Sequence, residues 1–350
     1  MQGSHPALGV GANDPFAITR RGDIPLRQAF PCYGRVNVPV DVVVVSFNSA
    51  GTLAGCIDPL CGFDEINVIV VDNASTDASV EVASSLPVTV LALEENRGFA
   101  HGCNRGWRAG SAEFALFLNP DARIDHAAIH RLEDVAQETT AGLVAPRISD
   151  ADGALEFSIR RFPRLRSTYS RALFLHRVFP RATWSDEDVR DPAEYERPHV
   201  VDWVSGACLL VRRDALEQLN GWDETFFHYG EDIDLCRRLW SHGFEVRFEP
   251  TAQAVHIGGA SAPRPRLRPL MVSNRVRYAR KHRRRPTALL EQGGAALEEL
   301  TRAALTRKGS AARAGHLGAL RVALRRKPHA DPSVRRWSDP SGVETRTRDD

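Results

Sequence analysis

Short apolar, β-branched runs alternate with helix-compatible segments between Val40 and about residue 120. Four of these runs have the length and composition of buried strands. They are Asp41–Ser46, Asn67–Val71, Val88–Leu93 and Phe114–Leu118. The segments between them, roughly 50–60, 75–85 and 98–109, are compatible with helices. This alternation predicts right-handed βαβ units around a parallel sheet, and therefore an α/β fold.

Polar residues follow three of the predicted strands. The first strand ends in Ser46-Phe47-Asn48, the second in Asp72-Asn73-Ala74-Ser75 and the fourth in Asn119-Pro120-Asp121. Because ligands of open α/β sheets bind beyond the carboxyl ends of the strands, these groups indicate one binding crevice. The alternative is structural, since Asn, Asp and Ser after a strand are common turn residues, and Ser75 or Asp77 also suits a helix cap.

The pattern loosens from about Leu143, and an arginine-rich stretch runs from Arg160 to Arg181. Order returns in Val200–Arg212, which predicts strands around Gly206. Apolar residues then recur at helical spacing from Ile233 to Trp240. This spacing predicts a helix that begins near Glu231 or Asp232 and ends at Gly243.

Five carboxylates are crowded around the start of that helix. They are Asp223, Glu224, Glu231, Asp232 and Asp234. The structural interpretation is that acids at a helix start interact favourably with the helix dipole. However, mutual repulsion and the apolar neighbours of these acids would raise a carboxyl pKa toward the range that suits a general base. We therefore favour a catalytic role.

Length and composition favour a folded protein of one large or two ordinary domains. The chain has 350 residues, of which 43% are hydrophobic and 26% charged. Its longest apolar runs are far shorter than the roughly 18–20 residues that cross a bilayer. The start of the sequence lacks a recognisable export signal, so a cytoplasmic location is expected. The six scattered cysteines are expected to be reduced core thiols.

Positive charge is concentrated in residues 261–350, which contain 22 Lys and Arg against 8 Asp and Glu, a net charge of +14. The preceding 260 residues carry a net charge of −12. Such a basic stretch suggests an anionic partner, either membrane lipid or nucleic acid, although it can also be merely solvated. Two segments within it, around 288–305 and 316–324, are expected to be helical.

Seven motifs in a fixed order give the chain a resemblance to a known family. They are Val42–Ser49, Val71–Asp77, Glu95–Ala100 with Gly102 and Asn104, Leu118–Asp121, Gly206–Leu210, Gly221–Leu239 and Val255–Gly259. Together they resemble the family 2 glycosyltransferases, especially the bacterial rhamnosyltransferase-like branch. The resemblance covers about Val40 to Arg285. It implies a GT-A fold, a nucleotide-sugar donor and inversion at the anomeric carbon.

The resemblance also implies roles for individual residues. Those expected to bind the donor are Ser46, Asn48, Asp72, Asn73, Asn96, Arg97, Gly98 and Asn119. Asp232, with Glu231 beside it, matches the catalytic base, which takes a proton from the attacking hydroxyl. Trp203 and Trp222 either stack on sugar rings or are structural.

Asp121 matches the residue that holds a divalent cation, Mg²⁺ or Mn²⁺, in the family. Such a cation bridges the two phosphates and neutralises the departing nucleotide diphosphate. The family often has two acids at this turn, whereas here the first is Asn119. The metal is therefore expected to use His256 as well, which otherwise is a surface or packing residue.

The resulting hypothesis is an inverting, metal-dependent transferase, of rhamnose from dTDP-rhamnose to a cell-envelope or lipid-linked saccharide. We expect a loosely ordered lead (1–37), a GT-A catalytic domain (38–260) and a basic, mainly helical extension (261–350). The catalytic domain is expected to have a nucleotide-binding half (38–122) and an acceptor-side half (123–260). The extension is expected to contact an anionic membrane at the inner face of the plasma membrane, or a second subunit.

Three other classes of protein remain to be weighed. A non-catalytic nucleotide-sugar or glycan-binding protein would keep the fold but not turn over. An NAD-dependent oxidoreductase should show a glycine fingerprint after the first strand, and Ser46–Gly51 lacks it. A nucleic-acid binder is suggested only by the basic stretch, and no nucleic acid is expected because the body is acidic.

Overall fold

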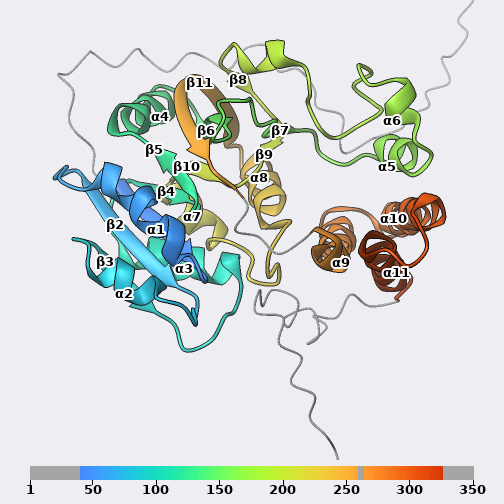
Figure 1. Ribbon diagram of the computed structural model, residues 1–350. Coiled ribbons are helices and arrows are strands. Elements are labelled where there is room, and N and C mark those ends of the chain that lie inside the picture. Colours follow the sequence, from blue (N-terminus) through green and yellow to red (C-terminus); the bar gives the residue numbers. More distant parts are fainter. Residues whose placement is uncertain (1–39, 259–263, 326–350) are drawn as a thin grey trace, which may run out of the picture. The chain divides into compact units, whose positions relative to one another are not determined.

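The centre of the computed structural model, which describes residues 40–258 and 264–325, is a nine-stranded β-sheet (Figure 1). Four neighbouring strands run parallel in the order β3-β2-β1-β4. They are β1 (Val40–Ser46), β2 (Ile66–Asp72), β3 (Thr89–Ala92) and β4 (Phe114–Leu118). The four strands predicted from the sequence are thus confirmed, to within one residue at each end.

The sheet continues beyond β4 in the order β10-β6-β11-β5. These strands are β10 (Cys208–Arg212), β6 (Ala141–Ser149), β11 (Glu245–His256) and β5 (Ala122–Ile124). β8 (His199–Val200) pairs with β11, while β7 (Ile159–Arg160) and β9 (Trp203–Val204) form a separate pair. Because β10 runs antiparallel to both β4 and β6, the sheet is mixed, and the start of β10 lies beside the end of β4.

Helices cover both faces of the sheet. Successive strand residues point to opposite faces, so Val42 and Val44 pack with α1 (Ala50–Ile57) and α4 (His126–Glu138). Val43 and Val45 pack with α3 (Phe99–Ala109), α7 (Arg213–Leu219) and α8 (Glu231–Ser241). The three helices predicted between the first strands are confirmed, although α2 (Ser79–Ser84) begins later than residue 75.

Three long helices form the C-terminal region, and Figure 1 shows them together. They are α9 (Arg264–His282), α10 (Arg285–Leu305) and α11 (Ala311–Ala323), and α10 also packs on α5 (Leu165–Ala172). The short helix α6 (Leu175–Val178) follows α5, and two 3₁₀ turns span Asp58–Leu60 and Pro192–Tyr195. The predicted α/β architecture with a helical, basic C-terminal region is confirmed.

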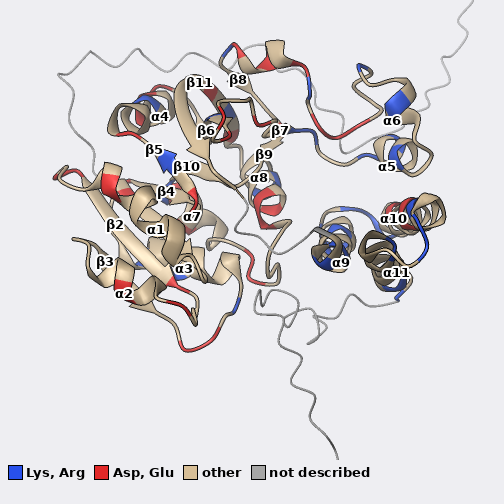
Figure 2. Cartoon of the chain, viewed as in Figure 1, with Lys and Arg blue, Asp and Glu red and all other residues tan. Residues whose placement is uncertain are grey.

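Acids of other segments neutralise part of the positive charge of α9, whose Lys and Arg residues are blue in Figure 2. Arg275 lies 2.9 Å from Glu298 of α10 and 3.0 Å from Glu187, and Arg268 lies 2.8 Å from Glu299. Burial alone would raise the pKa of Glu298, but Arg275 and three other arginines lower it to about 2. The basic helices are therefore fixed to the body and to one another by charge.

In the two described ranges, none of the helices is both long enough and apolar enough to span a bilayer. The five cysteines that the structure describes are free thiols, as predicted; they are Cys56, Cys61, Cys103, Cys208 and Cys236. Cys32 and the predicted lead, residues 1–37, lie outside the described residues.

Candidate active site

The carboxyl ends of β1 and β2 place three predicted donor-binding residues side by side. Ser46 and Asp72 are register partners, and the Asn73 N–H donates to the Ser46 carbonyl oxygen at 2.8 Å. All three are buried, yet Ser46 Oγ has no hydrogen-bond partner in the part of the chain that the structure describes. Because a buried hydroxyl without a partner is unfavourable, this strand end suits a polar ligand.

Asn48 follows β1 in the left-handed conformation, with a φ of 50°. Asparagine tolerates this conformation better than most residues. The Asn48 N–H donates to Ser75 Oγ at 2.9 Å, and Asn48 Oδ1 accepts the Thr76 N–H at 2.8 Å. Ser75 in turn donates its N–H and its hydroxyl to Asp72, at 2.8 and 2.5 Å. These hydrogen bonds join the two strand ends, and Ser75 stabilises the turn between them.

The carboxamide of Asn73 holds the loop that precedes α3. Its Nδ2 donates to Asn96 Oδ1 at 2.9 Å and to the Gly98 carbonyl at 3.2 Å, and its Oδ1 accepts the Arg97 N–H at 3.3 Å. The Arg97 side chain is half-exposed and lies 3.6 Å from Glu95. Seven of the predicted donor-binding residues are thus brought together at one edge of the sheet; they are Ser46, Asn48, Asp72, Asn73, Asn96, Arg97 and Gly98.

Gly98 fastens this loop to the segment before α8. Its φ is 97°, and a Cβ on it would lie 2.3 Å from the carbonyl oxygen of Phe227. That same oxygen accepts the Phe99 N–H at 2.8 Å. Only glycine allows so close an approach at this backbone conformation. The predicted donor loop and the predicted catalytic segment are therefore in direct contact.

Asp121 and His256, both predicted to hold a cation, are neighbours. His256 Nε2 lies 3.3 Å from Asp121 Oδ1, and the Ile257 N–H donates to the Asp121 carbonyl at 2.9 Å. The other ring nitrogen of His256 lies 2.9 Å from Glu156 Oε2. These hydrogen bonds to Asp121 and Glu156 raise the pKa of His256 to about 10.

The chemistry of this group fits a divalent cation. Asp121 supplies a carboxylate oxygen, and His256 supplies a nitrogen whose ring is oriented by a carboxylate on its other side, as is usual for metal-bound histidine. Without a cation, a protonated His256 provides the positive charge between the two acids. Asn119 has no side-chain hydrogen bond among the described residues, and its backbone N–H donates to the Ala207 carbonyl at 2.9 Å.

The structure separates the five crowded acids into two groups. Asp223 and Asp234 pair with Lys281 of α9, at 2.6 and 2.7 Å, and Asp234 also pairs with His282 and Arg238, both at 2.7 Å. Glu224 lies 2.8 Å from His101. Figure 2 shows the acidic start of α8. Within residues 40–258 and 264–325, Glu231 and Asp232 have no Lys or Arg within ion-pair distance.

Glu231 and Asp232 point in different directions. Burial and, secondarily, the charge of Glu231 raise the pKa of the Cys103 thiol, which places Glu231 near α3. Burial, followed by the charge of Asp232, raises the pKa of Glu231 to about 8, and Glu231 Oε2 lacks a hydrogen-bond partner in the described chain. Its neighbour His228 lies at 3.9 Å, and burial lowers the pKa of His228 to about 4.

Asp232 faces Gly206 instead. A Cβ at Gly206 would lie 3.7 Å from Asp232 Cβ and 3.9 Å from Asp232 Oδ2. Burial raises the pKa of Asp232, while the hydrogen bond from the Ile233 N–H and the charge of Arg160 oppose the rise. Since Ala207 is hydrogen-bonded to Asn119, the segment Gly206-Ala207 contacts both Asp232 and the turn that contains Asn119 and Asp121.

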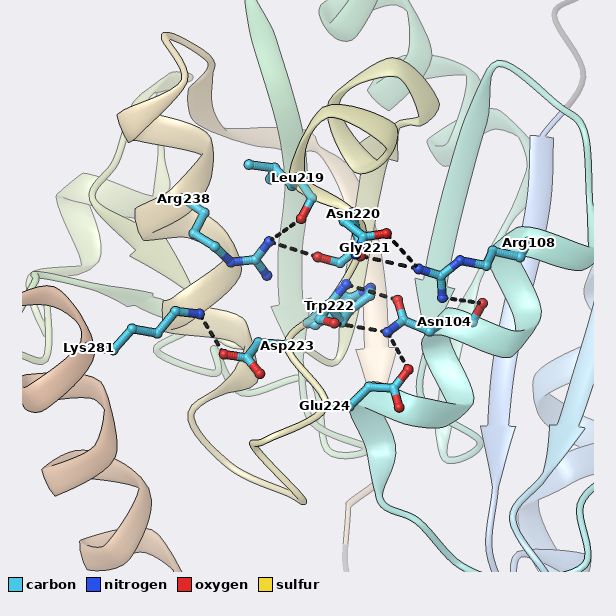
Figure 3. A pocket seen from close by; sticks show the side chains of 10 residues that line it. All are labelled: Asn104, Arg108, Leu219, Asn220, Gly221, Trp222, Asp223, Glu224, Arg238 and Lys281. Atoms are coloured by element: carbon cyan, nitrogen blue, oxygen red, sulfur yellow. Dashed lines mark hydrogen bonds and ion pairs between the residues drawn. The ribbon is translucent and has the colours of Figure 1, made fainter. Parts of the chain in front are cut away.

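A cavity of about 360 Å³ is lined from α3, α8, α9 and the loop 219–224 (Figure 3). Asp223 and Glu224 of the five crowded acids line it, whereas the residues predicted to bind the donor or the metal, and Glu231 and Asp232, do not. The buried Asn104 accepts the Trp222 N–H and donates to the Trp222 carbonyl, both at 2.9 Å. Arg238 donates to the carbonyls of Leu219 and Gly221, at 3.2 and 2.7 Å. These contacts hold the loop that leads to Glu231 and Asp232.

The two tryptophans differ in their surroundings. Trp222 is buried against the rings of Phe99 and Phe117, which agrees with the structural interpretation. Trp203 is partly buried and donates its Nε1–H to the Arg161 carbonyl at 3.0 Å. Only Trp203 therefore retains ring surface at which a sugar could stack.

Three residues near the site were not singled out individually as site residues from the sequence. Glu156 orients His256, Arg160 acts electrostatically on Asp232, and Asn274 of α9 donates to the carbonyls of His228 and Tyr229 at 2.9 and 2.7 Å. Arg160 opens the arginine-rich stretch in the predicted acceptor-side half. Glu156 and Asn274 lie in segments without a motif, so only the tertiary structure reveals them.

Comparison with known proteins gives matches along most of the described chain. A family model described as "Glycosyl transferase family 2" matches residues 41–219, and one described as "Glycosyl transferase family group 2" matches residues 179–284. The mannosyltransferase PcManGT from Pyrobaculum calidifontis, solved with GDP-Man and Mn²⁺, is 20% identical, with 86% of this chain and 84% of that one covered and a TM-score of 0.48.

Two curated relatives are rhamnosyltransferases by name. The N-acetylglucosaminyl-diphospho-decaprenol L-rhamnosyltransferase of Mycobacterium tuberculosis is 35% identical over 206 residues, which cover 55% of this chain and 66% of that protein. Rhamnosyltransferase WbbL of Escherichia coli K12 is 28% identical over 171 residues, which cover 45% and 60%. The chain thus spans just under two thirds of the length of the first relative.

Proposed function

Because the chain belongs to glycosyl transferase family 2, we propose that it transfers a sugar from a nucleotide diphosphate donor to a hydroxyl of a saccharide acceptor, with inversion. The contact between Gly98 and Phe227 supports this proposal most, because it fastens the donor loop to the segment that carries Glu231 and Asp232. A one-step displacement needs the donor and the base close to one reacting carbon, and a direct contact between the two segments supports such an arrangement.

The strand ends are the proposed donor site. Ser46, Asp72 and Asn73 present polar groups from β1 and β2, and Arg97 and Asn96 close the site from the loop before α3. Asp121 and His256 would hold Mg²⁺ or Mn²⁺. A cation there neutralises charge on the departing diphosphate. Asn119, whose side chain is neutral, lowers the acidity of this turn relative to a two-acid site.

Asp232 is the proposed base. Its raised pKa makes it a better proton acceptor than an ordinary carboxylate, while Arg160 and the Ile233 N–H keep the ionised form accessible. Glu231, with a pKa of about 8, is neutral at pH 7 and therefore adds no second negative charge beside the base. The pair therefore suits one proton acceptor and one neutral partner.

We propose rhamnose, from dTDP-rhamnose, as the transferred sugar and a polyprenyl-diphosphate-linked saccharide as the acceptor. The names of the mycobacterial and Escherichia coli relatives support this specificity. A protein that binds nucleotide-sugar without turnover is the alternative, and the experiment below separates the two.

We also propose that the protein acts at the inner face of the plasma membrane. Leu289 and Leu290 of α10 are 59% and 51% exposed, and the exposed Arg284 and Arg285 stand close before them in the chain. An apolar pair beside cations suits the interface of an anionic bilayer. Leu289→Ser with Leu290→Ser should reduce flotation with phosphatidylglycerol vesicles. Equal flotation of the variant and the parent chain would refute this.

The function is tested by donor binding and turnover measured together. A panel of nucleotide sugars, with and without Mn²⁺, is screened by thermal shift, since a ligand that binds only the folded state raises Tm. Release of nucleotide diphosphate is then followed with lipid-linked saccharides. We expect stabilisation by dTDP-rhamnose with Mn²⁺, and weaker Mn²⁺-dependent stabilisation for Asp121→Asn.

Asp232→Asn should keep donor binding and lose about 10²- to 10⁴-fold in turnover, the usual contribution of a general base. Glu224→Gln is the matched control, because Glu224 lies in the same segment but pairs with His101. Donor binding without turnover in the parent chain would favour the non-catalytic alternative. Normal turnover of Asp232→Asn would remove Asp232 from its role.

A further inference from the structure

Two histidines and a glutamate converge at the amino end of β2, away from the strand ends described above. Glu65 immediately precedes β2, and His126 and His130 lie one turn apart on α4. The Nε2 atoms of the two histidines are 2.8 Å apart, and His130 Nε2 lies 3.5 Å from Glu65 Oε1. His126 Nε2 contacts the same glutamate oxygen. One atom from each residue therefore points at a common centre.

The surroundings fix these rings in place. Phe63 stacks on His126, with ring centroids 3.9 Å apart and planes inclined by 6°. His130 Nδ1 lies 2.6 Å from Glu133 Oε2, one turn further along α4. The first turn of α4 is itself capped by Asp125, whose carboxylate accepts the Ala128 N–H at 2.7 Å. The convergence is thus built from packed and hydrogen-bonded side chains.

Three electron-pair donors meet at the centre of this cluster. If His130 donates its Nδ1–H to Glu133, then a neutral His130 presents a lone pair at Nε2. Glu65 Oε1, and His126 Nε2 when that ring carries its hydrogen on Nδ1, present lone pairs to the same centre. One metal cation can accept electron pairs from all three atoms at once.

We propose that Glu65, His126 and His130 form a binding site for a divalent transition-metal ion of the Zn²⁺ type, with water as the fourth ligand. Zn²⁺ takes imidazole nitrogen at about 2.0–2.1 Å and carboxylate oxygen at about 2.0–2.2 Å in tetrahedral sites. Tetrahedral geometry at those bond lengths separates neighbouring ligand atoms by roughly 3.3 Å. The three ligand atoms already lie within 4.8 Å of one another, so only small movements are needed.

Glu133 completes the chemistry of the site. A metal-bound histidine usually donates its second N–H to a carboxylate, which fixes the tautomer and increases the basicity of the ligand. Glu133 occupies that position for His130; it is buried, and its second oxygen lacks a hydrogen-bond partner in the described chain. The site therefore has a ligand set and an orienting residue from two separate parts of the fold.

The site is distinct from the proposed catalytic cation. The catalytic cation is proposed at Asp121 and His256, beside the start of β5, whereas His126 follows the other end of β5. Neither Asp121 nor His256 belongs to the cluster, and the five residues from Asp121 to His126 span at most about 18 Å. A metal here would tie the loop before β2 to the first turns of α4. Its role is therefore structural, and it is independent of the proposed transfer reaction.

The test uses the full chain, free of an affinity tag, with His256→Gln throughout so that the catalytic position does not contribute. Zn²⁺ binding is measured by competition with a chromophoric chelator, and Co²⁺ binding by its visible absorption. We expect one equivalent of metal, a tetrahedral Co²⁺ spectrum and a higher Tm with metal. Glu133→Gln should weaken binding by about 10- to 100-fold.

His126→Gln with His130→Gln should abolish the tetrahedral Co²⁺ spectrum and weaken Zn²⁺ binding at least 100-fold. His242→Gln is the control, because His242 is exposed at the end of α8 and bonds only to the Arg238 carbonyl and neighbouring backbone. Unchanged Zn²⁺ affinity in the double variant, or no binding in the parent chain, overturns the proposal. If the double variant does not fold, Glu65→Gln is judged by the same criterion.

Discussion

The Glu231→Gln variant should become increasingly stable relative to the parent chain as the pH rises. Glu231 is buried, and burial followed by the charge of Asp232 raises its pKa from 4.5 to about 8. Between these values the folded chain holds a proton that the unfolded chain releases. The free energy of unfolding of the parent chain therefore falls as pH rises, by up to about 1.4 kcal/mol per pH unit.

The glutamine side chain of the Glu231→Gln variant would be neutral at every pH and would lack this dependence. From pH 5.5 to pH 7.5, the variant should gain about 3 kcal/mol on the parent chain, which is two pH units at that slope. Urea unfolding at a series of pH values measures the difference. Glu224→Gln is the control, for which the pH dependence of the stability difference should have the opposite sign. Burial raises the pKa of Glu224, but hydrogen bonds from His101 and Asn104 outweigh burial and lower the pKa. If the free energies of unfolding of the Glu231→Gln variant and the parent chain change equally with pH over this range, the neutral state of Glu231 is refuted.

Three further predictions concern the contacts that shape the site. Gly98→Ala should destabilise the fold by about 1–3 kcal/mol through backbone strain alone, and it should also weaken donor binding. Gly51→Ala is the control without either effect, because a Cβ at Gly51 meets nothing within 4 Å. Equal urea midpoints for the two variants would contradict this prediction. Asn274→Ala leaves the carbonyls of His228 and Tyr229 without their donor, so amide hydrogen exchange should rise in residues 228–232, and unchanged protection would exclude the bracing role. Glu298→Gln breaks a buried ion-pair cluster and should lower the free energy of unfolding by about 3–5 kcal/mol at neutral pH. Because the pKa of Glu298 is about 2 in the folded chain and 4.5 in the unfolded chain, this loss should shrink as the pH falls below 4.5. A constant loss from pH 5 to pH 2.5 would refute the pairing.

The nucleotide-binding half was predictable because its signals are local. Buried parallel strands appear as continuous apolar runs, and the four runs from Asp41 to Leu118 were recognised with their helices. The second half was harder to predict. β6 spans Ala141–Ser149 in the middle of the sheet, across the point at which the hydrophobic pattern loosens. Its order depends on β10 and β11, which are distant in the sequence, rather than on periodicity.

In the candidate site, too, local signals were predictable and long-range ones were not. Motifs singled out Asp121, His256, Asp72 and Asn73, as well as Glu231 and Asp232 of α8, because each lies in a recognisable segment. The sequence could not tell which of the crowded acids were free, since that depends on Lys281 and His282, nearly fifty residues away from Asp234. Long-range ion pairs carry no periodic signal, so the sorting of these acids needed the folded chain.

The pairing of α9 with the acidic loop has a practical consequence for protein engineering. Lys281 neutralises Asp223 and Asp234, and Asn274 ties down the backbone before Glu231. A chain cut after residue 258 would leave Asp223 without Lys281, would leave Asp234 with Arg238 alone, and would release the loop. When this region is exchanged between homologous enzymes, α9 and the loop before α8 should therefore be exchanged together.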